Sequence, residues 1–221
     1  MKVLDTWRKR AIAATTAALA CLGGGLFVTA GTAYAATCSD ADVAFVRGST
    51  ELPGPGLVGT PFTNAVMQNL PGRTVTTYGV DHAANIQQTS AGPGATDMTR
   101  HVTSVAATCP NTKFMLGGHT QGASVTDISI GIPTFLGTGA RIPTNLASRV
   151  SAVVVFGHPL ALTGGKITSA SQLYGPKAKE FCEPGDPVCA NRFNGIAHLL
   201  HAFDGSATDG GRFAASKVLG Q

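Results

Sequence analysis

The feature that most constrains this chain is a short turn near its middle. Residues 114–125 read FMLGGHTQGASV, an apolar run that enters the pentapeptide GHTQG and continues into residues that favour a helix. The pentapeptide has the spacing of a nucleophile elbow, G-x-S-x-G, in which a strand turns sharply into a helix and lifts a hydroxyl above a sheet. Here the hydroxyl belongs to Thr120 in place of serine. The turn therefore predicts a strand and a helix directly joined at Thr120.

The rest of the chain alternates between strand and helix patterns. We expect strands at residues 42–48, 74–80, 113–118, 149–159 and 177–182, and helices at 60–69, 95–107, 122–132 and 206–219. The first helix is expected to open at Thr60, because Pro61 would then stand in the first turn, where proline is favoured. Met98, Val102 and Val105 recur at helical spacing and predict one apolar helix face.

This alternation predicts the class of fold. Strands that alternate with helices form a mostly parallel sheet with helices on both faces. The continuous apolar run in residues 149–159 suits a central strand that is covered on both sides. Since no internal repeat and no linker interrupts the pattern, we predict a single α/β domain.

Residues 1–35 have the features of a secretory signal peptide. A basic start is followed by an apolar stretch of small residues and by the sequence AYA, which predicts cleavage after Ala35. The alternative is a membrane anchor, because the run is long enough to span a bilayer. Its content of Gly, Ala and Thr and the cleavage sequence favour secretion, and we expect a secreted domain of residues 36–221.

The predicted signal peptide also carries most of the net charge. Residues 1–35 contribute +3 of the formal +4 of the whole chain, which leaves +1 for residues 36–221. A nucleic-acid-binding protein needs a clustered basic face. We therefore expect no nucleic-acid partner.

Four cysteines remain after the predicted cleavage, and they are expected to form two disulfides. Cys182 and Cys189 flank the turn-rich segment EPGDPV and are expected to pair with each other, which leaves Cys38 to pair with Cys109. The alternative is a zinc site, but the paired C-x-x-C spacing of such sites is missing. We expect no metal and no other cofactor.

A hydroxyl nucleophile needs a base, and the base needs an acid that orients it. In this architecture the chain order is nucleophile, acid, histidine. Of the acids after the elbow, Asp186 lies in a tight loop after a strand, inside the sequence CEPGDPVC, and is preferred. His198 and His201 both follow Asp186, whereas His158 precedes it. Spacing alone favours His198 over His201 only slightly.

Four motifs occur in order along residues 36–221: RGSTE, LGGHTQGASV, CEPGDPVC and AHLLHAFDG. Together with the four cysteines they resemble the cutinase family of secreted serine esterases, from about Cys38 to the C-terminus. The resemblance implies a single-domain α/β-hydrolase fold without a large lid, which hydrolyses esters of apolar acids. It implies an ester or lipid substrate, a monomer, and no stable membrane span once residues 1–35 are removed.

The resemblance also implies roles for individual residues. Position by position, Thr120 falls on the nucleophile, Asp186 on the acid and His198 on the base. Ser49 and the backbone amide of Gln121 fall on the oxyanion hole. The two bridges of the family fall on Cys38–Cys109 and Cys182–Cys189. His82, His101, His119 and His158 are interpreted as ordinary packed histidines, with His119 at the mouth of the site.

Two positions depart from the family pattern. His201 stands where an aromatic residue is common, and Thr120 replaces the serine. β-Branching stiffens the side chain of a residue whose backbone is already strained, and the methyl group crowds the attacking oxygen. A misfit of ~1–3 kcal/mol slows attack roughly 5- to 150-fold.

Three functions are compatible with these observations. The leading one is a secreted cutinase-type ester hydrolase, acting on cutin-like polyester, short- or medium-chain esters or lipid esters. The second is a catalytically silent protein on the same fold that binds lipid or cell-envelope material. The third is a carbohydrate deacetylase of acetylxylan type, since a fold does not fix its substrate.

Overall fold

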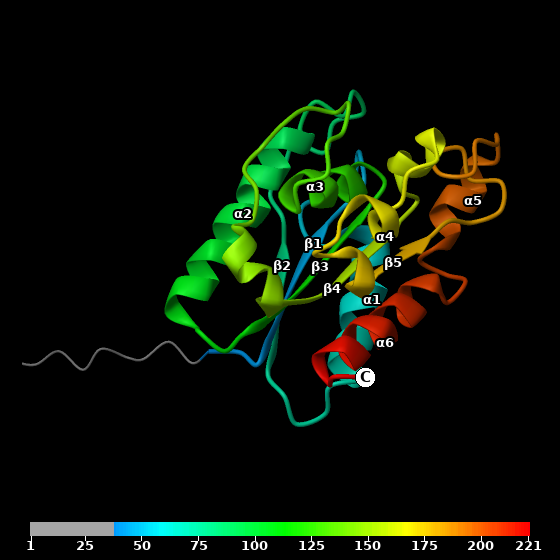
Figure 1. Cartoon of the computed structure of the whole chain (residues 1–221). Coiled ribbons are helices and arrows are strands. Elements are labelled where there is room, and N and C mark those ends of the chain that lie inside the picture. The colour runs from blue at the N-terminus through cyan, green and yellow to red at the C-terminus, as the bar shows by residue number, and fades with distance from the viewer. Residues whose placement is uncertain (1–37) are drawn as a thin grey trace, which may run out of the picture. The chain divides into compact units, whose positions relative to one another are not determined.

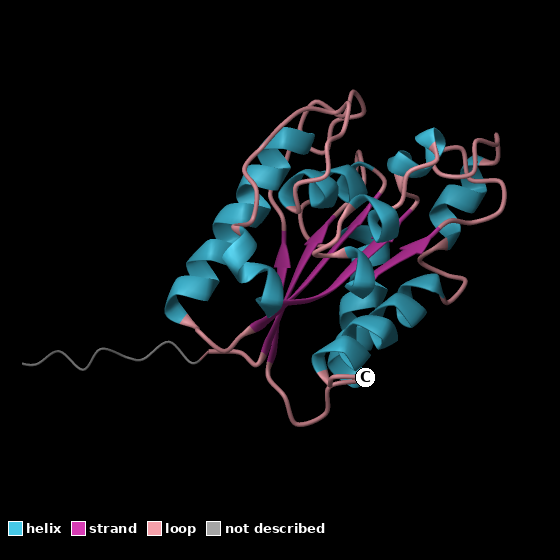
Figure 2. Cartoon of the chain, in the orientation of Figure 1, coloured by secondary structure: helices cyan, strands magenta, loops and turns pink. Residues whose placement is uncertain are grey.

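The computed structural model describes residues 38–221, so the predicted signal peptide lies outside the described residues. A five-stranded sheet with the order β2-β1-β3-β4-β5 runs through this part, and every neighbouring pair is parallel (Figure 2). The strands are β1 (Ala41–Val46), β2 (Val75–Gly79), β3 (Lys113–His119), β4 (Val150–Phe156) and β5 (Ala178–Phe181). The predicted parallel α/β sheet is confirmed.

Helices cover both faces of the sheet (Figure 1). The longer ones are α1 (Gly56–Gln68), α2 (Ala91–Thr108), α3 (Gln121–Ser129) and α6 (Ser206–Val218). Successive strand residues point to opposite faces, so Ala44 and Val46 pack with α2 and α3, whereas Val43 and Phe45 pack with α1 and α6. This double burial explains why the central strands are apolar at nearly every position.

Shorter elements fill the connections at the edges of the sheet. They are η1 (Thr144–Arg149), η2 (Pro159–Thr163), α4 (Ile167–Ala170), η3 (Gly175–Lys177) and α5 (Gly195–Leu200). Because all strands are parallel, their carboxyl ends meet at one edge, and the loops that follow them lie together. None of the helices in the described residues combines the length and hydropathy needed to cross a bilayer.

Two helices begin earlier than predicted. α1 begins at Gly56, so Pro61 lies inside the helix and removes the N–H that would bond the carbonyl of Leu57. α2 begins at Ala91 and includes Gly92, where a Cβ would collide with the backbone of Thr138. Both helices extend four residues further toward the N-terminus than the sequence pattern indicates.

Two disulfides connect the cysteines in the predicted pairs. Cys38 is bonded to Cys109, 71 residues away, and ties the segment before β1 to the end of α2. Cys182 is bonded to Cys189, seven residues away, and closes the loop after β5. By loop-closure entropy the long bridge stabilises the fold by roughly 4 kcal/mol and the short one by roughly 2 kcal/mol.

His158 is a buried cation and not an ordinary packed histidine. Its Nε2 lies 2.6 Å from Asp127 Oδ2 and its Nδ1 lies 3.2 Å from Glu180 Oε1. Burial alone lowers the pKa of a histidine, but the two carboxylates outweigh burial and raise the pKa of His158 to about 9. The interpretation from sequence was wrong here, because the three residues come from separate parts of the chain, on α3, before η2 and on β5, and meet only in the fold.

This ion cluster predicts how stability depends on pH. The pKa of His158 in the folded chain, about 9, lies above the unfolded value of ~6.5. The stabilisation is therefore complete below pH ~6.5 and is lost as the pH rises through ~9. We expect the free energy of unfolding to fall by roughly 3 kcal/mol over that interval through this group, measured by urea unfolding at several pH values. His158→Gln has no such proton, and an equally steep fall in that variant would contradict the assignment.

Candidate active site

The elbow lies between β3 and α3, with Thr120 at its tip. Thr120 has φ 50° and ψ −111°, a backbone conformation that a β-branched residue rarely adopts. A Cβ at Gly118 would collide with the carbonyl of Gly122, and a Cβ at Gly122 would collide with the carbonyl of Val46. The two glycines of the motif are therefore required by the close approach of backbone to backbone.

The methyl group of Thr120 has a defined neighbour. A Cβ at Gly48 would lie only 2.7 Å from Thr120 Cγ2 and 3.0 Å from His119 Nδ1. The methyl group thus packs against the bare Cα of Gly48, in the loop that carries the RGSTE motif. Glycine at this position leaves the space that threonine needs at the elbow.

Asp186 and His198 form a hydrogen-bonded pair beside the elbow. His198 Nδ1 lies 2.9 Å from Asp186 Oδ2 and 3.0 Å from Oδ1, and the N–H of Val188 donates to Oδ1 at 2.6 Å. Burial by itself raises the pKa of Asp186, but hydrogen bonds from His198 and from the Val188 amide, with the ring of His201 nearby, hold it well below its usual range. Asp186 is therefore a carboxylate that fixes the orientation of His198.

His198 and Thr120 line the same pocket. In the described part of the chain, no hydrogen bond joins Thr120 Oγ1 to His198. Catalytic hydrogen bonds often tighten only when a substrate is bound. The arrangement can therefore support transfer of a proton from Thr120 to the free Nε2 of His198.

Two further histidines, His119 and His201, lie beside the Asp186–His198 pair, and only His119 lines the pocket. The ring of His119 stacks on His198 at 4.7 Å between centroids, and its Nε2 lies 3.2 Å from the carbonyl oxygen of His198. Burial lowers the pKa of His119, so the ring that stacks on His198 is neutral. His201 is fully buried, with Nε2 3.5 Å from Asp186 Oδ2. Its ring does not line the pocket, which distinguishes it from His198.

Ser49 and Gln121 are joined by a hydrogen bond, and Ser49 lines the same pocket as Thr120. The Ser49 hydroxyl donates to Gln121 Oε1 at 3.4 Å, and Gln121 Nε2 donates to Ser90 Oγ at 3.2 Å. The backbone N–H of Gln121 is the first of α3, where N–H groups have no partner within the helix. A hydroxyl and a free N–H beside a nucleophile can stabilise a developing oxyanion.

Two charged residues that the sequence analysis missed hold the loop of Ser49 in place. Arg47 is buried and donates to the carbonyl oxygens of Val80 at 3.2 Å and His82 at 2.5 Å. Glu51 accepts from the N–H groups of Gly48 at 3.2 Å and Leu57 at 3.3 Å. Arg47 and Glu51 are the first and last residues of the RGSTE motif. Their place in this motif is the feature of the sequence that could have identified them.

The pocket at the elbow has a volume of about 460 Å³. Its apolar part is formed by Leu57, Ile86, Val188 and Leu199, and its polar part includes Ser49, Glu51, His119, Thr120 and His198. Outside this pocket, Glu183, His201 and Asp204 place possible metal-ligating atoms within 4.8 Å of one another. The sequence analysis did not group these three residues.

A glycine that the sequence analysis also missed sets the position of the His198 ring. Gly157 has φ +53°, and a Cβ there would lie 2.6 Å from His198 Cε1 and 2.8 Å from Nδ1. We expect Gly157→Ala to displace the ring from Asp186, which NMR would detect as loss of the downfield Nδ1 proton resonance. Gly164→Ala is the matched control, because Gly164 has φ +76° and a Cβ added there would meet no atom within 4 Å.

Both substitutions carry a similar backbone cost of roughly 1–2 kcal/mol. Only Gly157→Ala adds the contact with His198. If the resonance persists in both variants, Gly157 does not set the position of the ring.

Comparisons with known proteins agree with this geometry. The cutinase family model matches residues 37–218. A cutinase of Kineococcus radiotolerans is 55% identical over 186 residues, and the match covers 83% of this chain and 63% of that protein. The probable carboxylesterase Culp3 of Mycobacterium tuberculosis is 40% identical, with 84% of this chain and 77% of that protein covered.

Solved structures give the same result. The cutinase of Trichoderma reesei, solved with a phosphonate inhibitor, has a TM-score of 0.66 at 29% identity, over 82% of this chain and 77% of that one. The single-domain α/β fold with a parallel sheet between helices is that of the cutinase-like α/β-hydrolases. The chain belongs to the cutinase family.

Proposed function

We propose that this protein is a cutinase-type carboxylic ester hydrolase in which Thr120 is the nucleophile, His198 the general base and Asp186 the orienting acid. The observation that carries the proposal is the hydrogen bond between Asp186 and His198, because His198 lines one pocket with Thr120, whose hydroxyl lies at the tip of a strained elbow. Relatives that are named cutinase and carboxylesterase support it.

The residues present supply each step of acyl transfer. Thr120 Oγ1 attacks the ester carbonyl while its proton passes to His198 Nε2, and Asp186 stabilises the imidazolium that forms. The Ser49 hydroxyl and the Gln121 N–H stabilise the oxyanion of the tetrahedral intermediate. The intermediate breaks its bond to the alcohol, which takes the proton from His198. Water, deprotonated by His198, then hydrolyses the acyl-threonine and releases the acid.

The pocket supports an apolar acyl group as the substrate. Leu57, Ile86, Val188 and Leu199 form an apolar wall beside Thr120, and Ile86 is 70% exposed. Apolar side chains that remain exposed beside a reactive centre favour binding of apolar ligands. We therefore propose esters of short- or medium-chain apolar acids as the substrate class.

Substitutions of Thr120 test the proposal directly. Thr120→Ser removes β-branching from a residue with a strained backbone and keeps the hydroxyl, so relief of ~1–3 kcal/mol should raise hydrolysis roughly 5- to 150-fold. Thr120→Ala and His198→Ala should abolish the activity of the parent protein. The rates are measured with p-nitrophenyl acetate and butyrate. Ser124→Ala, one turn further along α3, is the matched control and should leave the rate unchanged.

Each other outcome has a distinct meaning. A lower rate with serine would show that the pocket has adapted to threonine as its nucleophile. A parent rate no higher than that of His198→Ala would refute the proposed mechanism for the native chain. Absence of turnover in the parent and in Thr120→Ser, with both folded, would favour the silent lipid- or envelope-binding protein.

We also infer that residues 1–35 direct export and that cleavage follows Ala35. The two disulfides support this inference, because such bonds persist mainly in oxidising compartments. The intact mass of protein recovered from the medium should correspond to a chain that begins at Ala36 with four thiol hydrogens lost. Recovered protein that retains residues 1–35 would contradict the assignment.

A further inference from the structure

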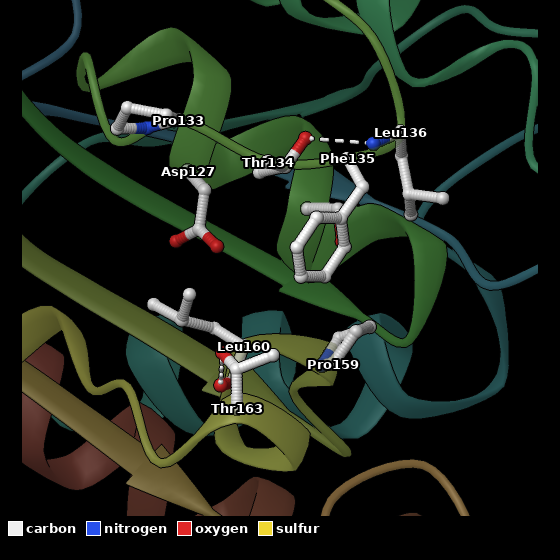
Figure 3. A pocket seen from close by; sticks show the side chains of 9 residues that line it. Asp127, Pro133, Thr134, Phe135, Leu136, Pro159, Leu160 and Thr163 are labelled. Atoms are coloured by element: carbon white, nitrogen blue, oxygen red, sulfur yellow. Dashed lines mark hydrogen bonds between the residues drawn. The ribbon is translucent and has the colours of Figure 1, made fainter.

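A second pocket shares no lining residue with the one that contains Thr120 and His198. It has a volume of about 230 Å³ and lies between α3, the segment that follows α3, and η2 (Figure 3). Phe135, Leu136, Pro159 and Leu160, together with Pro133, form the apolar part of its wall. The proposed hydrolysis uses none of these residues.

Asp127 of α3 gives this apolar pocket one charged group. Its side chain is 1% exposed, and Figure 3 shows the carboxylate directed into the space between Thr134 and Leu160. Asp127 Oδ2 accepts the hydrogen bond from His158, whereas Oδ1 is buried and has no hydrogen-bond partner within residues 38–221. A buried acceptor without a partner is costly, so a donor supplied by a ligand would stabilise this site.

The charges around Asp127 select the kind of donor. His158 faces two carboxylates, Asp127 and Glu180, and Glu180 Oε1 also accepts the N–H of Ile167 at 2.6 Å. Two carboxyl groups thus face a single imidazole, and no basic side chain from the described residues lines the pocket. The site therefore favours a cation or a neutral donor and repels a carboxylate.

The size of the pocket limits the ligand. A cavity of about 150 Å³ accommodates benzene, and pockets for drug-sized molecules begin near ~300 Å³. A pocket of about 230 Å³ thus suits one ring, or an aliphatic group of similar size, with a single short substituent.

We propose that this pocket is a second binding site, for a small apolar molecule that carries one ammonium or hydroxyl donor. The apolar body packs against Phe135, Leu136 and Leu160, and the donor binds Asp127 Oδ1. Ser124, one helical turn after Thr120, also lines the pocket. The ligand would therefore bind along the same helix that carries the elbow.

Three compounds of one shape test the proposal: benzylamine, benzyl alcohol and benzoate, titrated into the folded protein at pH ~7 by calorimetry and NMR. Benzylammonium should bind tightest if the ligand is a cation, and benzyl alcohol should bind at least as tightly if it is a neutral donor. In both cases benzoate should bind at least about tenfold more weakly, because it places a second negative charge beside Asp127.

Variants of the two pockets identify where binding occurs. Thr163→Trp, at an exposed position on the rim of the second pocket, should weaken binding at least about tenfold by filling the space. Ile86→Trp, in the wall of the pocket at the elbow, is the matched control and should leave binding unchanged. Asp127→Asn should abolish the preference for benzylammonium over benzoate.

Asp127→Asn removes one member of a buried ion pair, so its melting temperature is measured first. If Asp127→Asn does not fold, Thr163→Trp still tests the site. The proposal is overturned if benzoate binds as tightly as both donors, if none of the compounds binds at millimolar concentration, or if Thr163→Trp leaves binding unchanged. The experiment measures binding and not ester hydrolysis, so its outcome does not depend on the proposed function. Ile86→Trp shows whether the compounds bind in the pocket at the elbow instead.

Discussion

The strained backbone of Thr120 is the constraint on which the rest of the structure depends. A positive φ at a β-branched residue persists only where surrounding contacts impose it. Here the N–H of Thr120 donates to the carbonyl of Phe156 on β4 at 2.9 Å, and Gly122 brings α3 against the end of β1. The sheet and α3 together stabilise the elbow, and the residues of three other loops are placed around it.

Much of this arrangement can be predicted from sequence because local rules determine it. Alternating strand and helix patterns predict the parallel sheet, and the sheet collects the loops at one edge. The short interval between Cys182 and Cys189 predicts their pairing. The position of Asp186, between these cysteines and after a strand, follows from the same local reasoning.

The remaining features depend on contacts between distant segments. His198 and His201 lie three residues apart, one within α5 and one directly after it, and spacing in the sequence favours His198 only slightly. Their exposure separates them, since the side chain of His198 is 14% exposed and that of His201 is fully buried. Gly157 and His158 likewise look like an ordinary strand end in the sequence. The role of Gly157 depends on His198 of α5, and that of His158 depends on Asp127 of α3. Both helices reach the end of β4 only in the folded chain.

The short disulfide has a consequence for the time at which the site is completed. Asp186 lies within the loop that Cys182 and Cys189 close, and the same loop provides the Val188 N–H that binds its carboxylate. Thiols in a reducing cell interior do not form this bond. Without this bond the loop around Asp186 is less constrained, so the Asp186–His198 pair should be less well ordered in the reduced chain. Oxidation of the loop is thus a step in the assembly of this part of the pocket wall.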